Sequence, residues 1–186
     1  MDVELQKIIQ YLRMGGVLPD DALAERIAAL LKAADGEMRP KRTWLRMKTP
    51  QKWLDESKAL SIRLSGCVDV YLACGTLGAA YDAFHRRVSV KSGADALIVQ
   101  AIGAAAVEKV MDSIEDDIRA ELSPGESLVT RYSPGYADFP LSEQRTLLGL
   151  IDAPRKVGVS MTDDFLMVPS KSVSAVIGVR SGSAAT

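Results

Sequence analysis

The chain has 186 residues, a formal net charge of −1, 47% hydrophobic residues and 25% charged residues, which is the composition of one soluble globular domain. It shows no signal peptide and no apolar run near the ~18 residues that predict a membrane span, so we expect a cytoplasmic protein without membrane contact. With two cysteines, one histidine and no Cys/His cluster, a zinc site, a Cys–His nucleophile and a Ser–His–Asp triad all lack parts. Any chemistry is therefore expected to come from a cofactor or a partner.

Two amphipathic helices are predicted near the N-terminus. Apolar residues at helical spacing predict the first over Val3–Met14, and a Pro-Asp start predicts the second up to Asp35. After Pro40 we expect a short extended segment over Lys41–Lys48. Region 1–50 is therefore predicted to be a helical appendage packed on the main sheet.

One basic cluster overlaps this region, and it fits two interpretations. Its charges are interleaved with Trp44 and Trp53, as in some surfaces that bind nucleic acid or an acidic partner. A solvated strand at a sheet edge with two buried indoles is the favoured interpretation, and we expect no nucleic-acid partner. The basic residues are Arg39, Lys41, Arg42, Arg46, Lys48 and Lys52.

The middle of the chain is predicted to hold a short helix over Ser57–Leu64 and a central strand over Cys67–Ala73. Cys67 and Cys74 are seven positions apart, which on a regular strand places them on opposite faces, so we expect neither a disulfide nor a shared metal. A helix over Leu77–Val88 follows, and its His85 is interpreted as a surface residue.

A long helix is predicted over Gly93–Leu122. Its apolar stripe includes Leu97 near the start and continues to the end of the helix. Three acidic residues at positions i, i+4 and i+7 run beside this stripe, a pattern that is usually a solvated face. They are Glu108, Asp112 and Glu115.

The segment 131–140, between a strand over Ser127–Thr130 and a helix over Ser142–Ile151, is unusually rich in aromatic residues and proline. Pro134-Gly135 predicts a type II turn whose backbone groups are open to a ligand. The segment fits either a small-ligand loop or a structural turn with core aromatics. In the first case Arg131 offers a planar fork to a carboxylate or phosphate, and the tyrosines offer flat faces.

Three further strands are predicted in the C-terminal part, over Val157–Met161, Phe165–Val168 and Ser172–Val179. Strands grouped around long helices without strict βαβ alternation favour an α+β fold. We expect an antiparallel or mixed twisted sheet packed with the long central helix and flanking helices over residues 51–180, followed by a disordered tail, 181–186.

Several runs in this order resemble those of one known family. Arg131, Gly135 and Tyr136 form an Arg-x-x-x-Gly-Tyr motif, and the runs 161–169 (MTDDFLMVP) and 172–175 (SVSA) follow it. Residues 96–119 are similar in register to the long helix that precedes the ligand loop in this family. The step 76–78 (TLG) is similar to the corresponding step in stand-alone members of the family. Over roughly residues 57–180 the chain resembles the activation, or reactivation, domain of cobalamin-dependent methionine synthase.

The resemblance implies a ligand and partners. In that family the domain binds S-adenosylmethionine and docks on the cobalamin-binding module. An electron from a flavodoxin-type donor and a methyl group from S-adenosylmethionine then restore methylcobalamin. The implied role is a reactivation subunit for cobalamin-dependent methionine synthase or another corrinoid protein, not catalytic by itself, with cobalamin carried by the partner.

The resemblance also implies roles for individual residues. Arg131 would pair with the methionine carboxylate, and backbone groups of Ser133 and Pro134 would recognise the adenine edge. Gly135 would permit close approach, and Tyr136 would lie against adenine or the sulfonium.

Glu108 and Asp112 align with an acidic pair of the family that faces the cobalamin module. Residues 137–144 (ADFPLSEQ), in contrast, replace a Cys- and His-bearing segment of the family. Two alternatives therefore stay open: a docking module for a corrinoid protein that does not bind S-adenosylmethionine, and a sensor of another small metabolite.

Overall fold

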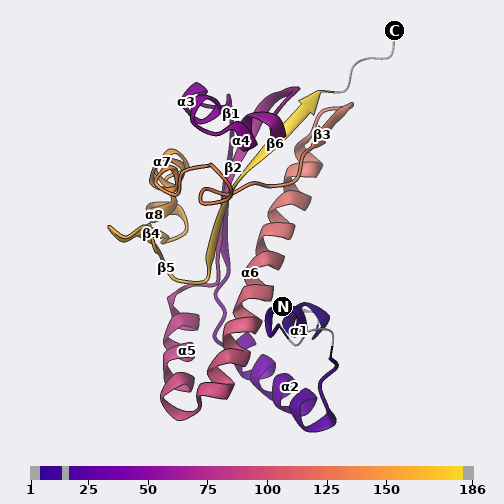
Figure 1. The fold of residues 1–186 in the computed structure, drawn as a ribbon, viewed down its shortest axis with the longest axis vertical. Coiled ribbons are helices and arrows are strands. Elements are labelled where there is room, and N and C mark those ends of the chain that lie inside the picture. The colour runs from indigo at the N-terminus through magenta and orange to yellow at the C-terminus, as the bar shows by residue number, and fades with distance from the viewer. Residues whose placement is uncertain (1–4, 14–16, 182–186) are drawn as a thin grey trace.

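Eight helices and six strands form the part of the chain that the computed structural model describes, residues 5–13 and 17–181 (Figure 1). The helices are α1 (Leu5–Tyr11), α2 (Asp21–Asp35), α3 (Gln51–Glu56), α4 (Lys58–Arg63), α5 (Ala79–Lys91), α6 (Gly93–Glu121), α7 (Glu143–Leu150) and α8 (Ala153–Lys156). The strands are β1 (Lys41–Met47), β2 (Cys67–Thr76), β3 (Glu126–Leu128), β4 (Ser160–Met161), β5 (Met167–Val168) and β6 (Ser172–Ser181). The predicted helix ends Val3 and Met14 and the tail from residue 182 lie outside the described residues.

The main sheet has four strands in the order β1-β2-β6-β3, and all its pairings are antiparallel. Strands β4 and β5 pair separately as a short hairpin. The predicted α+β class is confirmed, with β2 in the interior of the sheet and β1 at its edge.

The C-terminal half of α6 covers one face of the sheet. Met111, Ile114 and Ile118 of this helix pack against alternate residues of β2 and β6. At Gly75 of β2 a Cβ atom would lie 2.8 Å from Val110 of α6, so the missing side chain allows the helix to approach closely. The other face of the sheet carries α3, α4, α7 and α8 around the buried Trp53 and Phe139.

The N-terminal half of α6 extends beyond the sheet, where α1, α2 and α5 surround it (Figure 1). Ile8 of α1 and Ile27 of α2 are fully buried in this helical cluster. The two N-terminal helices thus contact mainly α6, rather than the sheet as expected. Leu97, predicted on the apolar stripe, is 68% exposed, because the helices around it bury Ile98 and Val99 instead.

Two expectations about β1 and β2 are wrong in part. A bulge between Cys67 and Asp69 shifts the register of β2, so Cys67 packs on the same side of the sheet as Cys74. Both thiols are free, as expected. Of the two indoles, Trp53 is buried, but it belongs to α3; Trp44 is half-buried and donates to Glu121.

The basic residues around β1 form ion pairs with carboxylates of the chain itself. Arg46 binds Asp69 and Glu126, with the shortest contact at 2.5 Å. Lys52 of α3 binds Glu143 at 2.5 Å. Arg42 pairs with Asp117 and Lys48 with Asp69, so four of the six basic residues are compensated within the chain.

Candidate functional site

The segment 131–140 is anchored at both ends by the core. Tyr132 exchanges two backbone hydrogen bonds with Val176 of β6, and Phe139 is 1% exposed against Trp53. The Tyr132 ring stacks on Phe139, and the Arg63 guanidinium lies 5.2 Å from the centre of the Tyr132 ring. Tyr132 and Phe139 thus serve the structural role, whereas Tyr136 is 65% exposed.

The predicted type II turn is present at Pro134-Gly135. Gly135 has a φ of 91°, and the Tyr136 N–H donates to the Ser133 carbonyl at 3.3 Å. The Gly135 N–H donates to the Phe139 carbonyl at 2.8 Å, so these two amides are used inside the loop rather than left open to a ligand. A Cβ at Gly135 would lie 3.1 Å from Leu141, and Gly135 does not line the neighbouring pocket.

Arg131 lies against the acidic residues of α6. Its Nη1 donates to Asp112 at 2.8 Å and to Glu115 at 2.6 Å, and its Nη2 donates to Glu108 at 2.5 Å. The predicted acidic line is therefore an ion-pair cluster and not only a solvated face. Hydrogen bonds from Arg131 and Lys7 outweigh the effect of burial and keep the pKa of Asp112 below its usual value.

Helix α1 borders this cluster. Lys7 approaches Asp112 at 3.3 Å, and one helical turn later Tyr11 lies near Glu108. Burial, together with the negative charge of Glu108, raises the pKa of the Tyr11 phenol. Three carboxylates therefore surround Arg131; Asp112 also binds Lys7, and Glu115 also binds Arg119 at 2.9 Å.

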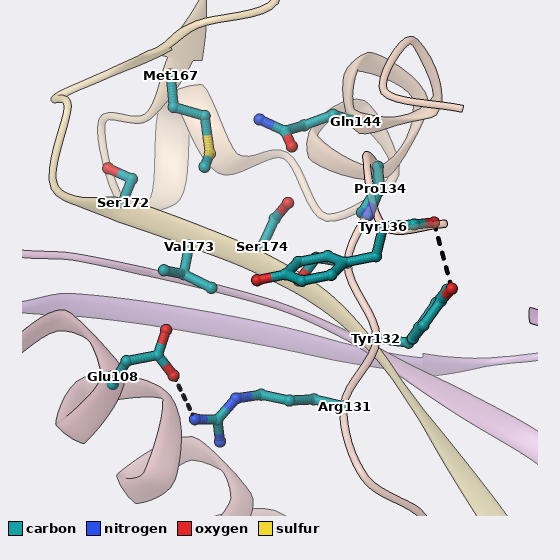
Figure 2. A pocket seen from close by; sticks show the side chains of 11 residues that line it. Glu108, Arg131, Tyr132, Pro134, Tyr136, Gln144, Met167, Ser172, Val173 and Ser174 are labelled. Carbon is teal, nitrogen blue, oxygen red and sulfur yellow. Dashed lines mark hydrogen bonds and ion pairs between the residues drawn. The ribbon is translucent and has the colours of Figure 1, made fainter. Parts of the chain in front are cut away.

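A pocket of about 390 Å³ opens beside the cluster, a volume typical of small-molecule sites (Figure 2). Of the predicted site residues, it brings together Glu108, Arg131, Ser133, Pro134 and Tyr136, but not Gly135 or Asp112. Figure 2 shows Arg131 and Glu108 at one end, Gln144 and Met167 at the other, and the Tyr136 ring between them.

Sequence reasoning did not assign the rest of the lining. Tyr132 was considered only as a flat face of the loop, and the residues not predicted for the site are Gln144, Met167, Ser172, Val173 and Ser174. Four of them lie in the runs 161–169 and 172–175, which were recognised only as marks of the resemblance. Pairing of β6 with Tyr132 brings these runs next to the loop, a contact that local sequence patterns do not reveal.

No group of three or more His, Cys, Asp or Glu side chains in residues 5–13 and 17–181 is placed to hold a metal ion. Over the same residues, each helix is too short or too polar to cross a membrane.

Comparison with known proteins gives a family match and a structural match. A family model described as "Vitamin B12 dependent methionine synthase, activation domain" matches residues 90–184, just over half of the chain. Among solved structures the chain is similar to the "Crystal Structure of the MetH Reactivation Domain bound to AdoHcy", with a TM-score of 0.61 and 14% sequence identity. This match covers 99% of the present chain and 76% of the other, and at such low identity it concerns the fold. No curated protein matches the sequence.

Proposed function

Because the chain belongs to the family of activation domains of vitamin B12-dependent methionine synthase, we propose that it binds S-adenosylmethionine in the pocket between Arg131 and Gln144. In this role it would be an accessory subunit for the reductive methylation of cobalamin. The cobalamin would be carried by methionine synthase or a related corrinoid methyltransferase. The observation that carries the proposal is the position of the pocket: its lining lies within the family-matched residues and has one charged and one neutral end.

The charged end fits the amino-acid part of S-adenosylmethionine. Among the described residues, the Nε–H and the second Nη2–H of Arg131 have no acceptor, so they are available to a carboxylate. The carboxylates beside Arg131 would complement the ammonium and the sulfonium of the ligand. Glu108 is the carboxylate of the cluster that lines the pocket.

The remaining predicted residues would hold the nucleoside. Ser133 and Pro134 line the pocket, where their backbone groups would recognise the adenine edge, and the exposed ring of Tyr136 would offer a face to the base or the sulfonium. Gly135 would act indirectly, by allowing the turn that places its neighbours. When bound, S-adenosylmethionine supplies a methyl group for the cobalt of the partner, and this chain supplies binding and orientation.

The acidic residues of α6 would contact the partner protein, and region 1–50 would support them. We propose that Glu108 and Asp112 face the cobalamin module in the complex, with a flavodoxin-type protein as electron donor in the cytoplasm. In the isolated chain both carboxylates hold Arg131, so docking would exchange one set of ion pairs for another. Helices α1 and α2 would act as an appendage that supports this part of α6.

Thermal unfolding with and without S-adenosylmethionine tests the proposal. Ligand at about 100 times its dissociation constant adds about 2.7 kcal/mol to native stability, which raises Tm by roughly 5–10 °C for a domain of this size. The ligand-induced shift should vanish in Arg131→Met and persist in the matched control Arg87→Met, since Arg87 pairs with Glu37 away from the pocket. An unshifted wild-type Tm, or an equal shift in Arg131→Met, would refute the site.

One observation favours the docking module as a second candidate. Arg131 already binds three carboxylates of its own chain, so a ligand carboxylate has to compete for it. In that case the protein would co-purify with a corrinoid protein in the absence of S-adenosylmethionine, and its Tm would not respond to the ligand.

A further inference from the structure

The end of the pocket opposite Arg131 holds two polar side chains without hydrogen-bond partners in the described structure, and one of them is fully buried. Ser174 is 2% exposed, and its Oγ has no hydrogen-bond partner in the described structure. Gln144 is 5% exposed as a residue, and its side-chain amide forms no hydrogen bond with the described residues; unlike Ser174 Oγ, this amide is not fully closed off from the pocket space. Both side chains line the pocket, and in Figure 2 they point toward the same space beside Met167.

The neighbouring Ser172, in contrast to Ser174, has hydrogen-bond partners for its hydroxyl. Its hydroxyl lies 2.7 Å from the Pro169 carbonyl and 2.8 Å from the Thr76 hydroxyl, although it is on the same strand and lines the same pocket. Buried polar groups in folded proteins are nearly always paired, because they have otherwise lost water without gaining a partner. Unpaired groups on a pocket wall are therefore groups that a ligand can satisfy.

The chemistry of the two groups selects a class of ligand. A glutamine amide presents a donor and an acceptor in one plane, which matches the adjacent N6 amino group and N7 acceptor of a 6-aminopurine. The Ser174 hydroxyl adds one donor and acceptor beside it. The uncharged character of this end suits a neutral ring, and the flat face of Tyr136 and the thioether of Met167 lie around the same cavity.

We propose that Gln144 and Ser174 form a subsite that recognises the 6-amino edge of the ligand's purine base. This inference rests on the proposed function, because it places the base at the end of the pocket opposite the amino-acid group held by Arg131. It adds side-chain recognition by α7 and β6 to the backbone groups of the 131–136 loop.

Calorimetric binding of two probes tests the subsite: S-adenosylhomocysteine, and S-inosylhomocysteine, in which a 6-oxo group replaces the amino group. We expect the wild type to prefer the adenosyl compound by about ten-fold, equivalent to about 1.4 kcal/mol. Gln144→Met, which keeps the length of the side chain, should remove this preference. Gln100→Met, on the exposed face of α6, should retain it.

Ser174→Ala provides a second measurement that does not depend on the folding of the Gln144 variant. Its hydroxyl has no partner to lose, so the stability of the unliganded protein should not fall, while binding of S-adenosylhomocysteine should weaken several-fold. If the wild type binds and Gln144→Met keeps the ten-fold preference, or Ser174→Ala binds as tightly as the wild type, the subsite is overturned and the proposed function stands. If the wild type binds neither probe, the subsite and the proposed function are both overturned.

Discussion

The cluster around Arg131 predicts a stability change that is separate from ligand binding. Replacing Arg131 by methionine keeps an apolar stem but leaves Glu108, Asp112 and Glu115 without their shared cation. Hydrogen bonds to charged groups contribute about 1.5–3 kcal/mol each, and breaking a fully buried ion pair costs about 3–5 kcal/mol. Arg131 is 22% exposed and Asp112 is 44% exposed, so solvent weakens the effect. We expect a loss of about 2–3 kcal/mol and a decrease in Tm of roughly 5–10 °C.

The loss should depend on pH in a defined direction. The pKa of Asp112 is lowered in the folded state, so its contribution to stability is present above the ordinary aspartate pKa of about 4 and is lost as the pH falls through the lower folded value. The stability difference between the wild type and Arg131→Met should therefore be largest near pH 7 and decrease below about pH 4.

Urea unfolding of a double-mutant cycle measures the effect. Glu115→Gln should destabilise the wild type, because it removes a 2.6 Å ion pair with Arg131, and should cost less in the Arg131→Met variant, where only the pair with Arg119 is lost. Equal stability of Arg131→Met and the wild type at pH 7 would refute the reasoning. So would a Glu115→Gln effect of equal size in both backgrounds.

Two other substitutions, both measured by urea unfolding, test buried contacts of the fold: the Glu143–Trp53 hydrogen bond and the packing of Gly103 against Tyr81. Glu143→Leu should cost about 1–3 kcal/mol at pH 7, because it leaves the buried Trp53 N–H without its 2.6 Å acceptor. Burial opposes the charge of Glu143, but Lys52 and Trp53 lower its pKa overall, so this cost should shrink as the pH falls below about 4; a constant cost would contradict the assignment. Gly103→Ala improves helix propensity by up to about 1 kcal/mol, yet its Cβ would lie 2.6 Å from the Tyr81 ring. We expect a net loss of about 1–2 kcal/mol, and a gain in stability would show that Tyr81 can move aside.

The elements with strong periodicity were predictable from sequence, whereas two of the short helices, α3 and α8, were not. The 29 residues of α6 carry a continuous apolar pattern, and β2 and β6 are rich in branched residues. Helices α3 and α8 have six and four residues, too few to show a period. The bulge after Cys67 also left no sequence signal, and it reversed the predicted face of that cysteine.

The candidate site was predictable where its residues are close in sequence. The loop from Arg131 to Tyr136 stood out through its turn chemistry and aromatic content. Gln144 and Ser174 did not, because they enter the pocket through the fold: one by the start of α7, the other through the pairing of β6 beside Tyr132. Burial without a hydrogen-bond partner is a property of three-dimensional structure, so sequence gives no sign of it.

The position of β6 in the sheet also sets an order for folding. Cys74 of β2 pairs with Ser174 of β6, so the longest ladder of the sheet joins residues 100 positions apart. Contacts this distant form slowly, and during synthesis at about 5–20 residues per second they must wait for the last strand to emerge. The helices around α6 can associate earlier, while β2 keeps an unpaired apolar edge that is open to aggregation. The pocket is completed by the same late step, so a nascent chain becomes competent for ligand only when its sheet closes.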